Sequence, residues 1–119
     1  DSKSTTPHST ISALRGLPGA VLIAGGRNKG LDLTLLKEAK PHAVIAIGEA
    51  AEEIVKIFEH ECSVEVANTM DEAVEKAYKK SLPVGTVLLS PACASFDWYE
   101  SYVERGLDFI RAVSQLEIP

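Results

Sequence analysis

Cysteine is scarce in this 119-residue chain, whose two cysteines, Cys62 and Cys93, lie far apart and make no C-x-x-C pattern. Two such thiols provide neither the framework of a disulfide-stapled domain nor the ligand set of a structural zinc site, so we expect both to be free. The three histidines, His8, His42 and His60, share no metal-ligand spacing. We therefore predict no metal site in this chain.

Basic residues are also in deficit. Lysine and arginine total 12 against 17 aspartates and glutamates, which gives a net charge of -5. Nucleic acids and anionic membranes bind basic faces, so we expect neither as a partner. No apolar run approaches the roughly 20 residues of a membrane span, and the first ten residues are polar where a signal peptide needs an apolar stretch. We expect a cytoplasmic protein.

Four short apolar runs, rich in β-branched residues, alternate with longer amphipathic segments. The runs cover residues 20–25, 42–48, 63–67 and 86–90. This alternation predicts an α/β fold, a three-layer Rossmann-like domain in which helices flank a mostly parallel sheet. The third run alternates polar and apolar residues, whereas the others are continuously apolar, so we expect the third strand at an edge. The length is that of a single domain, residues 1–119.

The segments between the runs place apolar residues three and four positions apart, which predicts helices over residues 33–40, 49–60 and 69–80. Thr69 and Glu72 have the spacing of a capping box at the start of the third of these helices.

Two further helices are expected, near residues 8–15 and 99–115. Gly106 weakens the last helix locally. The residues of that helix that we expect to supply apolar contacts are Tyr102, Leu107, Phe109, Ile110 and Val113.

Ligands of open parallel sheets bind outside the carboxyl ends of the strands, where the loops over residues 25–30, 48–50 and 90–95 converge. In the first loop, GGRNKG, Arg27 and Lys29 place two cations ready to meet a carboxylate or phosphate, unless the glycines serve only a turn. The loop matches neither the P-loop nor the G-x-G-x-x-G pattern. In the second loop, Glu49 either binds a ribose or favours the start of a helix.

The third loop lies in the stretch SPACASFDWYESY, residues 90–102. Ser90 and Ser95 flank Pro91, and Ser95 either offers its hydroxyl and helix-terminal N–H groups to an anion or caps the last helix. Cys93 is a possible nucleophile, but its alanine neighbours favour a buried thiol. Trp98, Tyr99 and Tyr102 suit the core or its rim better than a ligand platform.

These stretches, with DSKSTT (1–6), LIAGGRNKGLD (22–32) and the final F-I-R-A-V helix, resemble the C-terminal domain of the D-glutamate-adding Mur ligases. The similarity runs nearly end to end. The Asp-Asn-Pro-Arg motif of the diaminopimelate- or lysine-adding relatives is missing, which disfavours those sister enzymes. Where many members have an acidic residue before the lysine, this chain has Arg27 and Asn28.

The resemblance implies the amino-acid-binding domain of a three-domain, ATP-dependent ligase. Such a ligase joins D-glutamate to UDP-N-acetylmuramoyl-L-alanine during peptidoglycan synthesis, and so serves cell shape and division. ATP and magnesium would be held mainly by the missing central domain, over which this domain closes. The isolated chain would be an inactive monomer with no catalytic residue.

The resemblance also implies roles for single residues. Lys29 would pair with one carboxylate of D-glutamate, and Thr5 would hydrogen-bond it. The residues that would hold the other carboxylate are Ser95, Phe96 and Tyr102, through hydroxyl or backbone groups. The residues that would face the nucleotide are Asp1 and Lys3. Two alternatives stay open: a stand-alone Rossmann-like module that binds an anion or nucleotide, and a thiol enzyme that uses Cys93.

Overall fold

The computed structural model describes residues 10–11, 14–16, 20–27, 33–81, 87–92, 99 and 101–115. Its sheet has four parallel strands in the order β3-β2-β1-β4. The strands are β1 (Val21–Gly25), β2 (Ala43–Ile47), β3 (Ser63–Val66) and β4 (Val87–Ala92). The parallel α/β fold predicted from the sequence is confirmed, as is the position of β3 at an edge.

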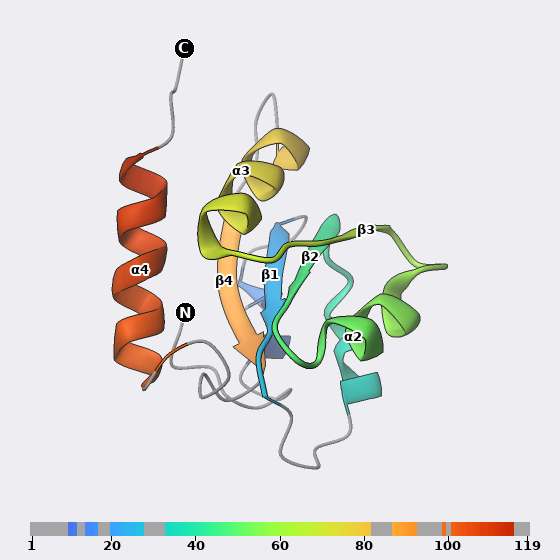
Figure 1. The fold of residues 1–119 in the computed structure, drawn as a ribbon. Coiled ribbons are helices and arrows are strands. Elements are labelled where there is room, and N and C mark those ends of the chain that lie inside the picture. Colours follow the sequence, from blue (N-terminus) through green and yellow to red (C-terminus); the bar gives the residue numbers. More distant parts are fainter. Residues whose placement is uncertain are drawn as a thin grey trace.

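Helices cover both faces of the sheet, which makes three layers (Figure 1). The helical elements are η1 (Leu33–Ala39), α2 (Ala51–Phe58), α3 (Met70–Ser81) and α4 (Tyr102–Ser114). The described residues near the N-terminus, 10–11 and 14–15, are also helical, as expected. Among the described residues, no helix is both long enough and apolar enough to cross a membrane.

Two cores lie on opposite faces of the sheet because successive strand residues point to opposite sides. Leu22, Ala24 and Val44 face η1 and α2, and pack against Leu36 and Phe58. The residues of β1 and β2 that face α3 and α4 are Val21, Ile23, Ala43, Ile45 and Ile47. Every residue of β1 and β2 is buried, as their continuous apolarity predicts.

The segment 33–40, expected as an amphipathic α-helix, forms the 3-10 helix η1. Pro41 follows directly and disfavours helical backbone at Lys40, whose φ is +47°. Leu33 and Leu36 are both fully buried, and a spacing of three places them on one face of a 3-10 helix. A three-residue spacing is compatible with either kind of helix, so the sequence pattern did not decide between them.

The last helix buries only part of the face that was expected, since Phe109 packs against the core and other expected residues do not. Leu107 is 61% exposed and Ile110 is 62% exposed, and Val113 is exposed as well. Ala112 is buried instead, with Phe109 half-buried against the same core. Because α4 has apolar residues around its circumference, periodicity did not fix its rotation. Gly106 lies within an unbroken helix, and the side chain of Tyr102 lies outside the description.

Candidate functional site

The strand order places a topological switch point between β1 and β4. From β1 the chain moves outward through β2 to β3, and β4 then returns to the other side of β1. In open parallel sheets, ligands bind outside the carboxyl ends of the strands at such a point. Gly25 and Ala92 are paired neighbours there, at the last residues of β1 and β4. The loops that follow these two strands therefore start side by side.

β4 ends two residues beyond residue 90, the end expected for this strand, so Pro91 and Ala92 belong to the strand and not to a loop. The pairing of β1 with β4 shifts between Ile23 and Gly25, where two steps of β1 oppose three steps of β4. This irregularity accommodates Pro91, since proline lacks the N–H of a regular ladder and is found at sheet edges and bulges.

The chain leaving β1 is fastened by its backbone to the chain leaving β2. The N–H of Gly26 donates to the carbonyl of Ile47 at 3.1 Å, and the N–H of Ala50 donates to the carbonyl of Gly26 at 2.9 Å. Gly25 has φ +135°, and a Cβ there would lie 1.9 Å from the Ile47 carbonyl oxygen. Gly25 thus permits a close approach of two backbones that any side chain would block.

Arg27 contacts a carboxylate of the same chain. Its Nε lies 3.3 Å from Glu49 Oε2, and one terminal nitrogen lies 3.2 Å from Oε1. Glu49 precedes Ala50, the N-cap of α2, so it lies outside the helix that it was expected to favour. The pair links the loops after β1 and β2, and the charge of Arg27 is already balanced within the fold.

A shallow hollow of about 370 Å³ lies beside this pair, at the start of α2. Its lining residues are Glu49, Ala50, Glu52, Glu53 and Lys56. Three carboxylates against one ammonium make the hollow unfavourable for a ligand with two carboxylates. The hollow is therefore a poor candidate for an acidic amino acid.

Most of the predicted ligand-binding residues lie outside the described residues. They are Asp1, Lys3, Thr5, Lys29, Ser95 and Phe96. Tyr102 is the first residue of α4, and only its backbone is described. Chain length limits the positions of two of them. Lys29 follows Gly25 by four residues, so their Cα atoms are at most ~14 Å apart. Ser95 follows Ala92 by three residues, so their Cα atoms are at most ~11 Å apart.

Ser101 is the cap of the last helix. Its Oγ accepts a hydrogen bond from the N–H of Glu104 at 3.2 Å, and its backbone is extended. The helix thus begins seven residues after Ser95. The interpretation of Ser95 as the cap of this helix is therefore wrong. The spacing of Ser101 and Glu104 is that of a capping box and was the signal available for this cap.

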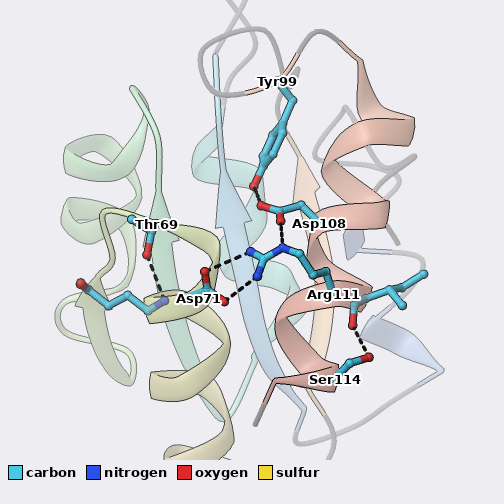
Figure 2. Close-up of polar contacts among 8 residues, drawn as sticks. Thr69, Asp71, Tyr99, Asp108, Arg111 and Ser114 are labelled. Atoms are coloured by element: carbon cyan, nitrogen blue, oxygen red, sulfur yellow. Dashed lines mark hydrogen bonds and ion pairs between the residues drawn. The ribbon is translucent and has the colours of Figure 1, made fainter.

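A network of polar side chains joins Tyr99, α4 and α3 (Figure 2). The hydroxyl of Tyr99 donates to Asp108 Oδ2 at 2.5 Å, and Nε of Arg111 donates to Asp108 Oδ1 at 2.5 Å. The terminal nitrogens of Arg111 donate to both carboxylate oxygens of Asp71, at 3.2 and 3.0 Å. Asp108 and Arg111 have the spacing of a helical ion pair, whereas no sequence pattern indicated Asp71 or Tyr99 as their partners.

The network shifts the proton affinities of its members. Burial raises the pKa of Tyr99, and its hydrogen bond to the Asp108 carboxylate raises it further. Burial alone would also raise the pKa of Asp108, but the hydrogen bonds from Tyr99 and Arg111 outweigh burial and hold that pKa below its ordinary value. Tyr99 therefore stays a protonated donor and Asp108 a charged acceptor across the neutral range.

Of the two cysteines, Cys62 is among the residues that the structure describes. It is a free, half-buried thiol, as expected. Burial raises its pKa, and the charge of Glu61 adds to the effect. A raised pKa leaves little thiolate at neutral pH, so Cys62 is a poor nucleophile. Cys93, the residue of the thiol-enzyme alternative, lies outside the described residues.

No protein-family model matches the chain. Curated proteins do match it. One is the UDP-N-acetylmuramoylalanine--D-glutamate ligase of Chlorobium limicola, 46% identical over 98% of this chain and 26% of its own length. Ligases of the same name from Pelodictyon phaeoclathratiforme and Aquifex aeolicus are 42% identical, over 98% and 92% of this chain and 26% and 28% of their own lengths.

The chain thus spans about a quarter of the length of the curated relatives that it matches. These relatives are ligases by name, and the similarity predicted from the loop sequences is confirmed. Over nearly its whole length, this chain is homologous to a domain-sized part of the UDP-N-acetylmuramoylalanine--D-glutamate ligases.

Proposed function

We propose that this chain is the C-terminal domain of a three-domain, ATP-dependent ligase, and that it binds the D-glutamate added to UDP-N-acetylmuramoyl-L-alanine. The observation that carries the proposal is the switch point between β1 and β4. The loops containing Lys29 and Ser95 leave paired strand ends there, at Gly25 and Ala92. The names of the relatives supply the substrate that such a site would take.

D-Glutamate presents two carboxylates and an amine. Its carboxylates call for a cation and for N–H or O–H donors, the groups that Lys29 and Ser95 provide. Thr5 would hydrogen-bond the first carboxylate beside Lys29, while Phe96 and Tyr102 would complete the donors around the second. Arg27 is already paired with Glu49, which leaves Lys29 as the cation assigned to the ligand.

This chain does not suit the task of holding the nucleotide by itself. The sequence has no P-loop, and in the part of the chain that the structure describes, no three His, Cys, Asp or Glu side chains are grouped to hold a metal ion. The proposal therefore assigns ATP and magnesium to the rest of the ligase, with Asp1 and Lys3 facing the nucleotide when the domains close. ATP supplies the activation of the acyl carboxylate there.

The proposed role of this chain is to orient the amine of D-glutamate toward that activated carboxylate and to close over the domain that holds it. A ligase of this kind makes peptidoglycan precursors in the cytoplasm. On this proposal the isolated 119-residue chain neither hydrolyses ATP nor forms the amide. Purified chain that turned over ATP would contradict it.

Lys29→Ala in the full-length ligase is the direct test. Loss of one charge-assisted hydrogen bond, about 1.5 to 3 kcal/mol, corresponds to roughly 10- to 150-fold weaker use of D-glutamate. The loss should fall on KM for D-glutamate, and on kcat as well if Lys29 also orients the amine. KM for ATP and for the UDP precursor should stay near wild type.

Arg27→Ala is the matched control, since it removes a cation two residues away whose partner is Glu49. Steady-state kinetics with each substrate varied in turn should show little change in its use of D-glutamate. Unchanged D-glutamate kinetics in Lys29→Ala, or a loss confined to ATP, would overturn the assignment of Lys29.

A further inference from the structure

The edge strand β3 directs part of its backbone away from the sheet. Of the strands that the structure describes, β3 is the outermost, with β2 as its one neighbour (Figure 1). The N–H of Ala67 donates to the carbonyl of Ala46 at 2.9 Å, so Ala67 faces β2. Because successive strand residues direct their N–H and C=O groups to opposite edges, those of Val64 and Val66 point away from β2. Such outward groups are a template for pairing with another strand.

Two lysines of α3 reach across to this strand. Nζ of Lys76 donates to the carbonyl oxygen of Val66 at 2.8 Å. Nζ of Lys80, about one turn further along α3, donates to Ser63 Oγ at 2.7 Å and lies 2.9 Å from Glu65 Oε2. One outward-pointing carbonyl is therefore already occupied by an ammonium, and a second lysine ties the same helix to the strand.

These two lysines differ from the lysine that lies between them in sequence. The side chain of Lys76 is 33% exposed and that of Lys80 is 23% exposed, whereas that of Lys79 is 70% exposed and pairs with Glu75 of its own helix. The hydrogen bond from Lys80 also lowers the pKa of the Glu65 carboxyl. Lys76 and Lys80 are thus held against β3, whereas Lys79 extends into solvent.

Without its lysine, the strand would suit pairing with a copy of itself. Val64 and Val66 are β-branched residues, which favour strands, and Val66 is 41% exposed. A second copy has the same open edge, and a two-fold axis can bring two such edges together as antiparallel strands. In that arrangement the Val66 carbonyl would accept a hydrogen bond from the other copy. The second strand could do so only after displacing the Lys76 ammonium.

We propose that Lys76 keeps β3 from pairing with the β3 strand of a second copy of this chain, and that Lys80 holds α3 where Lys76 reaches the Val66 carbonyl. This protection of the edge is separate from the proposed function, and neither residue is assigned a contact with a substrate. Lysine suits the task because a strand that approaches the edge must remove a strongly hydrated charge from water.

Lys76→Met in the 119-residue chain tests the proposal, because methionine keeps most of the side-chain length and removes the ammonium. Sedimentation equilibrium over a range of concentrations should give an association constant roughly 5- to 25-fold above that of wild type, since each copy in a pair no longer gives up a contact with a charged group. The variant is also more acidic than wild type, and charge repulsion alone would weaken its association. Association no stronger than that of wild type would overturn the proposal.

Lys79→Met is the matched control. It makes the same change of charge on the same helix, and it removes an ion pair with Glu75 that has the same spacing as that of Lys76 with Glu72. Because the ammonium of Lys79 pairs within α3, this variant should associate as weakly as wild type. Equal association of the two variants would show that loss of any lysine is enough, and would overturn the role of Lys76.

A second substitution identifies the surface through which Lys76→Met associates. Val66→Pro removes an N–H that points away from β2 and leaves the ladder between β2 and β3 in place. Val66→Lys adds a charge at the same exposed position without changing the backbone. In the Lys76→Met background, each should return association to the wild-type level, with urea unfolding used to check that the chain still folds. Association that survives Val66→Lys would come from another surface, such as the exposed Leu107 and Ile110 of α4, and would overturn the proposal.

Discussion

The helices on the two faces of the sheet are held in place by different combinations of forces. On the face of η1 and α2, large apolar side chains close the core, among them Leu33, Leu36, Ile54 and Phe58. On the other face, α3 buries Met70 and Val74 beside the smaller Ala73 and Ala77. Among the described residues of α4, Ala112 is the one buried apolar side chain. There the polar network of Asp71, Asp108 and Arg111 joins α3 to α4 in addition.

This difference indicates which contacts of the fold keep their strength when the pH or the salt concentration changes and which do not. Apolar burial involves no titrating group, whereas exposed charged pairs are screened by salt and are lost when their carboxylates are protonated. The segment proposed to bind D-glutamate leads into α4, on the face that depends on charged contacts. The fold thus combines an apolar base with a polar attachment beside the proposed site.

The largest effect should follow from breaking the apolar face. Phe58 is fully buried, so Phe58→Ala leaves a cavity and should lower the free energy of unfolding by about 3 to 5 kcal/mol. Phe109→Ala, on the half-buried side of α4, should cost clearly less. Urea unfolding of the 119-residue chain would measure both. Equal losses would contradict the contrast between the two faces.

Acid should loosen the α4 face. The pKa of Asp108 is lowered in the folded state, so its contribution to stability is present above the unfolded pKa of about 4 and is lost as the pH falls below that value. Glu65, whose pKa is lowered by its hydrogen bond from Lys80, contributes in the same direction. The free energy of unfolding, measured between pH 2 and pH 7, should therefore depend less on pH for Asp108→Asn than for wild type.

Phe58→Ala should keep the shape of the wild-type pH profile, because it removes no titrating group. If Asp108→Asn retained the full acid-side loss of wild type, the carboxylate network would not be what holds α4.

A smaller effect should separate local from tertiary stabilisation of α3. Thr69 Oγ1 accepts a hydrogen bond from the N–H of Glu72 at 3.1 Å, so the cap predicted from the sequence is confirmed. Thr69→Ala should cost about 1 kcal/mol. Ser114→Ala, which removes a bond to the Ile110 carbonyl in the last turn of α4, should stay within about 0.5 kcal/mol. Thermal unfolding checks both, and a silent Thr69→Ala would show that packing alone starts α3.

Much of the fold could be predicted because its signals are local. The apolar runs indicated the four strands, and the spacing of Met70, Ala73, Val74 and Ala77 indicated the buried face of α3. The cap at Thr69 was visible as a pair of residues three apart. Each of these features depends on neighbours in sequence, so no knowledge of the packing was needed.

Features that depend on packing were not predictable in the same way. The ion pair of Arg111 on α4 depends on Asp71, which lies 40 residues earlier in the chain. The pairing of Arg27 with Glu49 depends on which strands are neighbours. For the candidate site, the crevice rule indicated one edge of the sheet, but the strand order was needed to find the switch point between β1 and β4. The assignments of Lys29 and Ser95 remain predictions.

The position of D-glutamate in a crystal of the full-length ligase tests the central claim most directly. The account predicts the amino acid outside the ends of β1 and β4, with one carboxylate within about 3 Å of the Lys29 ammonium and the other within hydrogen-bond distance of Ser95. D-Glutamate bound away from these strand ends, in the acidic hollow at the start of α2 or entirely on the other domains, would contradict it.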